Sequence, residues 1–188
     1  MTSAETSPVR LRTLDLAYIA LFAVLTAVCA WITVPMPQPM VQFTLQTFAV
    51  FMTLAVLGGR RGTYAVVVYL LLGAVGVPVF SGMQGGLGVL LGSTGGYIVG
   101  FIAMALVYWL LTARLGASLP VTIAASVLGL AVCYAFGTAW YLAVYTSTKG
   151  PLSLMTALGW CVFPFIIPDL VKLVLAVLLA RRVKRFLK

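Results

Sequence analysis

The sequence predicts an all-α integral membrane protein with six transmembrane helices. Of its 188 residues, 63% are hydrophobic and only 8% are charged, whereas a soluble domain has about 25% charged residues. The apolar runs are long and lack alternation, which favours helices over a β-barrel. We therefore expect residues 1–188 to form a single transmembrane, substrate-binding domain surrounded by a lipid bilayer.

Hydropathy and turn residues define the expected helices in chain order. Thr13 is the expected N-cap of the first helix, and Asp15 in its opening turn suits the helix dipole. The proline-rich residues 35–39 end that helix in an extended loop. The next apolar run is short for a hydrocarbon core about 30 Å thick, so its polar start around Gln46 is expected to face the interior. The helices are expected at about residues 14–34, 45–58, 63–77, 97–113, 120–145 and 154–180.

Basic residues fall almost entirely on one side of this six-helix map. One side receives Lys149 alone, and Lys172 lies within the last helix. Such an asymmetry predicts cytoplasmic termini and external proline-rich and glycine-rich loops. It also explains the net charge of +9 without a nucleic-acid partner. The other side receives Arg10, Arg12, Arg60, Arg61, Arg114, Arg181, Arg182, Lys184, Arg185 and Lys188.

The composition argues against enzyme chemistry. Histidine is absent, and Asp and Glu together number three. Imidazole metal sites and Ser–His–Asp triads are thereby excluded. Cys29, Cys133 and Cys161 lie in separate apolar segments and are interpreted as small buried hydrophobes. We expect no enzyme activity, no metal site and no cofactor.

Asp169 and Lys172 lie inside the last apolar run. A charge at bilayer depth costs about 2.5–3.5 kcal/mol, and the spacing of three residues lets these two neutralise each other on one helix face. Pro164 and Pro168 remove two helical hydrogen bonds above the pair, which predicts a kink with free carbonyls. The pair is either the floor of a polar cavity open to the outside or a structural ion pair between helices. A cavity floor of this kind suits a small polar ligand with both donors and acceptors.

Seven glycines and no charge occur between Gly82 and Gly96. Glycine permits positive φ and close backbone approach, so this stretch is expected to be an irregular segment folded against the helices. Its spacing fits neither a dinucleotide-binding fingerprint nor a P-loop.

Residues 76–97, from Gly-Val-Pro-Val-Phe to Gly-Ser-Thr-Gly-Gly-Tyr, resemble the signature of the BioY family. These proteins are the biotin-specific S-components of energy-coupling-factor (ECF) transporters. Residues 44–47 (Thr-Leu-Gln-Thr) and 168–172 (Pro-Asp-Leu-Val-Lys) also resemble that family's motifs, so the likeness covers nearly the whole chain. One departure is Ser93, where the family is expected to have proline, and it should loosen one turn. The resemblance implies six helices with cytoplasmic termini in the bacterial cell membrane, and biotin held near the outer face under the first loop.

The resemblance also implies a set of ligand contacts. Asp169 is expected to accept hydrogen bonds from the ureido N–H groups of biotin, and Lys172 to donate to the ureido oxygen. The other expected contacts are Gln84, Gly85, Gly86, Thr94 and Tyr97, with Gln46 and Tyr141 as further candidates.

The resemblance implies partner proteins as well. Ala23 and Ala27 match the small-xxx-small motif by which the family's first helix docks on a transmembrane coupling subunit; internal packing is the alternative reading. Energy for uptake would come from two separate ATPase subunits, unless the protein works alone as a homo-oligomer. Competing functions are an S-component for another vitamin, such as thiamine or riboflavin, and a non-transport membrane structural protein.

Overall fold

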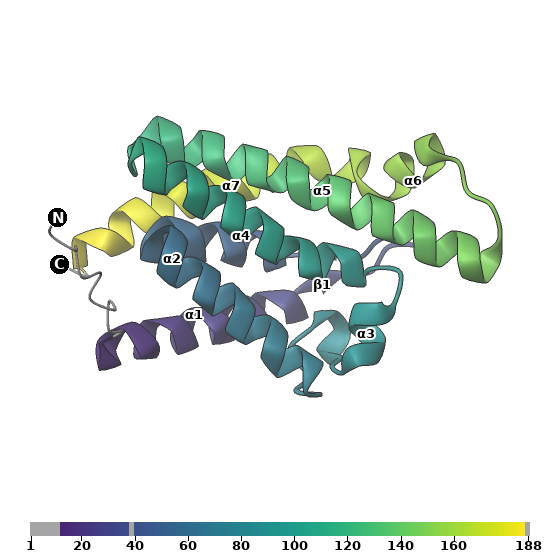
Figure 1. The fold of residues 1–188 in the computed structure, drawn as a ribbon, viewed down its shortest axis with the longest axis horizontal. Coiled ribbons are helices and arrows are strands. Elements are labelled where there is room, and N and C mark those ends of the chain that lie inside the picture. The colour runs from purple at the N-terminus through teal and green to yellow at the C-terminus, as the bar shows by residue number, and fades with distance from the viewer. Residues whose placement is uncertain (1–11, 38–39, 187–188) are drawn as a thin grey trace, which may run out of the picture.

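The long helices run side by side along the longest dimension of the molecule (Figure 1). The computed structural model describes residues 12–37 and 40–186, so Arg10 and Lys188 of the orientation argument, and residues 38–39 of the first loop, lie outside the described residues. The long helices are α1 (Thr13–Trp31), α2 (Gln46–Ala74), α4 (Gly95–Leu115), α5 (Leu119–Lys149) and α7 (Phe163–Phe186). The short elements are β1 (Thr33–Val34), β2 (Phe43–Thr44), a 3₁₀ turn (Ser81–Met83), α3 (Leu87–Leu91) and α6 (Leu154–Cys161).

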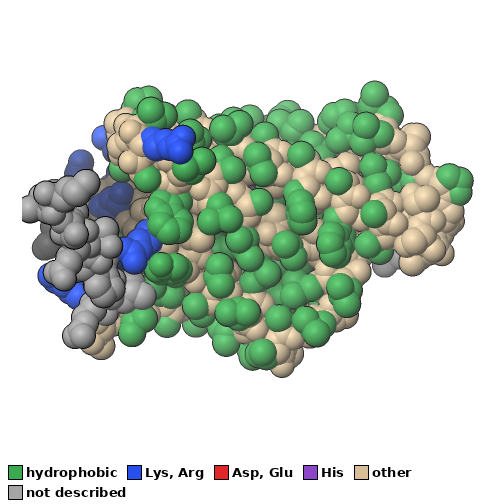
Figure 2. Space-filling model, in the orientation of Figure 1, with side chains coloured by type: hydrophobic (Ala, Val, Ile, Leu, Met, Phe, Trp, Pro, Cys, Tyr) green, Lys and Arg blue, Asp and Glu red, His purple; other side chains and the backbone are tan. Residues whose placement is uncertain are grey.

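The surface and the helix lengths fit a membrane. Within the described residues, five helical segments are long and apolar enough to cross a bilayer, with α6 and α7 counted as one. Figure 2 shows hydrophobic side chains along the visible face and Lys and Arg side chains at the end where α1 begins and α7 ends. The fold is therefore that of a multi-pass membrane protein, as predicted.

Helix α2 combines the second and third predicted helices. It is broken at Gly58, whose φ of 79° and ψ of 175° are not helical, and the helix resumes at the next residue. The predicted loop over residues 59–62 is therefore wrong. A positive φ is accessible to glycine without steric cost, so one residue redirects the chain where we expected a loop. The five long helical segments thus correspond to the six predicted helices when the two arms of α2 are counted separately.

The first helix is shorter than predicted. It ends at Trp31, and Thr33–Val34 then pairs with Phe43–Thr44 in a two-stranded antiparallel sheet. The loop that we expected to be extended is therefore flanked by the two paired strands of a small hairpin. The Trp31 indole donates to the Pro78 carbonyl (2.8 Å), which ties this end of α1 to the loop after α2.

The start of α1 also differs from the prediction. Arg12, not Thr13, is the N-cap, and its backbone N–H donates to Asp15 Oδ2 (3.1 Å). Asp15 lies in the first turn as expected. Its other oxygen forms an ion pair with Arg61 (3.1 Å), so the carboxylate also joins α1 to the second arm of α2.

The last predicted helix is interrupted. Helix α6 ends at Cys161 and α7 begins at Phe163, with Val162 between them in a non-helical conformation (φ −127°, ψ −58°). Pro164 therefore lies in the first turn of α7, where its missing N–H removes no helical hydrogen bond. Of the two prolines, only Pro168 lies inside the helix.

Ala23 and Ala27 are buried in the interior of the protein. They are 1% and 5% exposed and belong to a buried cluster with Tyr69, Leu70 and Phe80. The small-xxx-small pair thus brings α1 close to α2, which is the internal-packing alternative. In this structure the pair is not available as an intersubunit face, and the residues that α1 turns outward include Leu21, Val24 and Val28.

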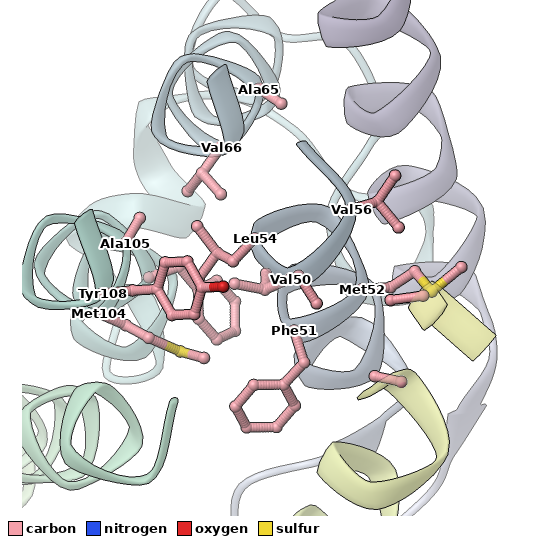
Figure 3. Close-up of a cluster of buried hydrophobic side chains, with 14 of the residues drawn as sticks. Val50, Phe51, Met52, Leu54, Val56, Ala65, Val66, Met104, Ala105 and Tyr108 are labelled. Carbon is pink, nitrogen blue, oxygen red and sulfur yellow. The ribbon is translucent and has the colours of Figure 1, made fainter. Parts of the chain in front are cut away.

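The main buried cluster holds α2 against its neighbours. Figure 3 shows Val50, Phe51 and Leu54 of α2 beside Met104 and Tyr108 of α4. Val50, Phe51, Leu54 and Met104 are fully buried, and Tyr108 is 2% exposed. This cluster fixes the position of the first turns of α2, which carry polar residues of the site described below.

Helices α4 and α5 meet through glycines. A Cβ on Gly96 would lie 2.2 Å from the Cβ of Trp140, and one on Gly137 would lie 2.3 Å from the Tyr97 ring. Small residues of this kind let two backbones approach closely in a membrane, where dispersion drives helix association.

We predict that Gly96→Ala destabilises the protein, because Trp140 Cβ can move aside only if α5 moves with it. Overpacking of this kind costs about 1–3 kcal/mol. Thermal unfolding in detergent, followed as the remaining monodisperse fraction, should show a lowered midpoint. The matched control is Gly159→Ala in α6, where an added Cβ meets nothing within 4 Å. An equal effect of the two substitutions would contradict the close α4–α5 contact.

Candidate ligand-binding site

A cavity of about 530 Å³ lies in the half of the bundle that contains the hairpin, α3 and α6. Its size is in the range typical of small-molecule sites. Its walls come from β2 and the segment before it, from the 3₁₀ turn and its flanking residues, and from helices α2, α3, α4, α5, α6 and α7. The described end of α7 and the start of α1 lie at the opposite end of the molecule (Figure 1).

Asp169 and Lys172 lie at the buried floor of this cavity. Their side chains form an ion pair with Lys172 Nζ 2.7 Å from Asp169 Oδ1. The residues are 2% and 5% exposed, so each charge is removed from solvent. A charge buried in a membrane must be paired, and the predicted mutual neutralisation on one face of α7 is observed.

The ammonium of Lys172 has three protein acceptors. Besides Asp169, it donates to the Thr44 carbonyl (2.7 Å) and to Thr47 Oγ1 (3.0 Å). It also lies 3.9 Å from the centroid of the Phe43 ring, a cation–π contact. Because an ammonium has three donors, all of them are used. Lys172 therefore joins α7 to β2 and to the start of α2.

The carboxylate of Asp169 keeps one acceptor position. Oδ1 accepts from Lys172 and from the Thr47 hydroxyl (2.8 Å), and Oδ2 accepts from the Tyr134 hydroxyl (2.6 Å). An ionised carboxylate has about four acceptor positions. Among the described residues Oδ2 accepts only the bond from Tyr134, so the free position is on Oδ2, and Asp169 is a lining residue of the cavity. The floor can thus accept one further hydrogen bond from a ligand.

Two more polar groups in the wall are held by hydrogen bonds. The Tyr97 and Thr138 hydroxyls lie 2.8 Å apart, bridging α4 and α5. The Gln46 amide donates to the Tyr69 hydroxyl, which in turn donates to the Val79 carbonyl (3.1 Å). These bonds fix two side chains of the lining, and within the described residues the Gln46 carbonyl oxygen accepts no hydrogen bond.

The upper wall of the cavity is aromatic. The Tyr141 and Tyr145 rings are stacked with their centroids 5.7 Å apart. A second stacked pair lies beside the floor, where Phe165 packs on Phe43 with centroids 6.3 Å apart. All of these except Phe43 are lining residues. A ligand that fills this cavity therefore meets polar groups at the floor and flat apolar surfaces above them.

Most of the predicted site residues line the cavity. Gln46, Gln84, Thr94, Tyr97 and Tyr141 do so, as do Asp169 and Lys172. The five uncharged residues come from helices α2, α4 and α5, from the N-cap of α4 and from the loop after α2. They are up to 95 residues apart in the sequence. Their contact with a ligand remains a prediction.

Gly85 and Gly86 do not line the cavity. A Cβ on Gly85 would lie 2.4 Å from the Val77 carbonyl oxygen. Gly86 has a φ of 96°, and its N–H donates to the Gly73 carbonyl (2.7 Å). These glycines fold the loop against the end of α2, so the structure gives them a packing role, not the expected ligand contact.

The sequence analysis missed three contributors to the floor. Tyr134 is not among the predicted site residues, although its spacing of seven residues from Tyr141 puts both on one face of α5. Thr47 lies in the polar stretch that is expected to face the interior, but it is not among the predicted ligand contacts. Phe43 had no signal in the sequence, because its contact with Lys172 depends on the hairpin register.

Two cysteines also line the cavity. Cys133 and Cys161 are both buried with free thiols, and the Cys133 thiol lies 3.6 Å from the Tyr97 carbonyl oxygen. Cys29 is buried in α1. The prediction that all three are buried is confirmed.

Comparison with known proteins points to one family. A family model described as the BioY family matches residues 2–188. A protein named biotin transporter BioY from Thermotoga maritima is 43% identical over 166 residues, covering 88% of this chain and 92% of its own length. A probable biotin transporter BioY from Pyrococcus horikoshii is 38% identical over 171 residues, covering 90% of this chain and 96% of its own.

A solved structure has the same fold. The crystal structure of the S-component for biotin from an ECF-type ABC transporter aligns with a TM-score of 0.78 at 24% sequence identity. The alignment covers 94% of this chain and 95% of that chain. The expected S-component architecture is therefore confirmed at the level of the fold.

We predict that Lys172→Met alone destabilises the ligand-free protein more than the double substitution Asp169→Asn/Lys172→Met. Removing one partner of a buried ion pair leaves an uncompensated charge and costs about 3–5 kcal/mol, whereas replacing both partners removes that charge. Thermal unfolding of the purified variants in detergent measures the difference. Arg182→Met, at an exposed position of the same helix, is the control for loss of a basic residue. A double variant as unstable as the sum of the two single variants would show that the pair is not coupled.

Proposed function

Because this chain belongs to the BioY family, we propose that it is a membrane biotin-binding subunit that mediates biotin uptake. It is a multi-pass protein of the cell membrane, and its family is one of transporters, not of enzymes. The observation that carries the proposal is the buried Asp169, which keeps a free acceptor position at the floor of a cavity with aromatic upper walls. The ureido ring of biotin offers N–H donors for such a floor, and its thiophane ring and valeryl chain suit apolar walls.

In the proposed complex, Asp169 Oδ2 accepts a hydrogen bond from a ureido N–H, beside the Tyr134 hydroxyl. Lys172 donates to the ureido oxygen, and because its three donors are engaged, it must exchange one bond to do so. The bond to Thr47 Oγ1 is the longest of the three at 3.0 Å, so it is the one that we assign to the exchange. Lys172 also orients the carboxylate in the ligand-free protein.

The remaining polar residues of the wall complete the proposed contacts. Tyr97 and Gln46 lie near the floor with one bond each to a protein partner that fixes them. Gln84 and Thr94 line the cavity from the loop after α2 and from the cap of α4. Tyr141 presents its ring to the thiophane and valeryl groups. These residues set the ligand's orientation, while the charged floor supplies the strongest hydrogen bond.

We further propose that uptake uses a transmembrane coupling subunit and two ATPase subunits. The outward residues of α1 form an apolar face suited to a second membrane protein, and we define this α1 face as Ala17, Ala20, Leu21, Val24 and Val28. It replaces Ala23 and Ala27, which lie against α2. Transport by a homo-oligomer without these partners is the alternative arrangement.

Thiamine or riboflavin is the competing ligand within the same architecture. The names of the two relatives above, both biotin transporters, favour biotin. A non-transport structural role is not favoured, because a protein with that role needs no cavity of this size around a buried charge pair.

We predict that purified protein binds biotin with saturation and a 1:1 ratio, measured by isothermal titration calorimetry in detergent. Asp169→Asn should lower the affinity about ten- to hundredfold, because a hydrogen bond to a charged group is worth about 1.5–3 kcal/mol. Unlabelled thiamine and riboflavin should not compete.

Asp15→Asn is the matched control for this titration, because Asp15 is also a buried, ion-paired carboxylate but does not line the cavity. Its affinity for biotin should equal that of the unchanged protein. Full affinity in Asp169→Asn would refute the role of the carboxylate. Competition by thiamine or riboflavin would reassign the ligand.

We predict that Val24→Trp, on the α1 face, abolishes uptake by cells that also express the coupling and ATPase subunits, while biotin binding stays intact. The bulky ring blocks close approach of a second membrane protein. Ala23→Trp should lose both activities, because Ala23 is buried and the ring cannot fit. Leu128→Trp, at an exposed position of α5, is the control. Normal uptake in Val24→Trp would move the docking site away from α1.

A further inference from the structure

Lys149 is a second cation of the cavity, far from the floor. It is the last residue of α5, is exposed, and contributes to the lining. Its ammonium lies 5.7 Å from the centroid of the Tyr145 ring, which also lines the cavity. The side chain therefore turns back along α5 over the aromatic wall, and its charge lies at the mouth.

The charge of Lys149 has no carboxylate partner in the described part of the chain. The acidic residues there are Asp15, which pairs with Arg61, and Asp169, which pairs with Lys172. The floor is thus electrically neutral, and the cavity has one net positive charge at its mouth. A lysine in the last turn of a helix also suits the helix dipole, but that role requires neither a place in the lining nor a contact with Tyr145.

The two polar ends of the cavity are well separated. Tyr134, which contacts Asp169 at the floor, and Tyr145, below the Lys149 ammonium, are eleven residues apart on α5. At the rise of an α-helix this is about 16 Å. A ligand that contacts both ends must be elongated, with a neutral hydrogen-bonding head and an anionic tail.

We propose that Lys149 forms an anion subsite at the cavity mouth and that the cavity selects ligands that join a neutral polar head to a carboxylate tail. The inference rests on the proposed function, because biotin is a ligand of this class, with a ureido head and a valerate tail. It adds that the carboxylate is itself recognised, and it names the residue that recognises it.

The test compares biotin with its primary amide, which keeps the size of the ligand but removes the charge. By calorimetry in detergent, the unchanged protein should bind biotin about fivefold more tightly than the amide, as expected for one partly exposed ion pair. In Lys149→Gln the affinity for biotin should fall to that for the amide, while the affinity for the amide stays the same. Lys149→Arg should restore the preference for the acid, and raising the salt concentration should shrink it.

Arg114→Gln, which removes an exposed cation in the last turn of α4, is the control and should leave both affinities unchanged. Equal losses for acid and amide in Lys149→Gln would overturn the anion subsite and leave the proposed function intact, and so would the absence of any loss. Failure of the unchanged protein to bind biotin would instead overturn the proposed function, and the anion subsite with it.

Discussion

The pairing of Asp169 with Lys172 is the interaction on which the rest of this structure depends. Two charges this deeply buried in a membrane protein are tolerated only when every donor and most acceptors have partners. Those partners come from the strand before α2, from α2 itself and from α5, through Thr44, Thr47 and Tyr134. The same bonds that stabilise the charges therefore bring three separate segments to one point, and the cavity is the space that these segments enclose.

Close helix contacts set the shape of that space. Gly96 and Gly137 bring α4 and α5 together so that Tyr97 and Tyr134 face the same cavity. The break at Gly58 lets α2 supply two arms, one that carries the polar floor partners and one that packs against α1. Packing and function are thus separated along the chain: the glycines and alanines determine where helices meet, and a few polar residues determine what the enclosed space can hold.

The sequence was sufficient for the class of fold, the charge pair and several of the polar residues that line the cavity. Both signals used here are local in the sequence. Two charges three residues apart in an apolar run correctly predicted the ion pair of Asp169 and Lys172, and the glycine-rich segment predicted an irregular loop. The missed features depend on long-range geometry. Gly58 could be recognised as a break only from its φ angle, and the place of Phe43 beside Lys172 only from the register of the hairpin. The burial of Ala23 could not be deduced either, because a small-xxx-small pair has the same pattern whether it packs within a chain or between chains.

Thr44 belongs to two parts of the molecule at once. It is a residue of the hairpin strand β2, and its carbonyl accepts a hydrogen bond from Lys172 at the floor. Strand β2 is consequently held to the buried ion pair at the floor of the cavity. Under the proposed function, a ligand that changes how Lys172 shares its three hydrogen bonds also changes the hold on β2, whose Phe43 ring contacts the same ammonium, so the site and the hairpin respond together.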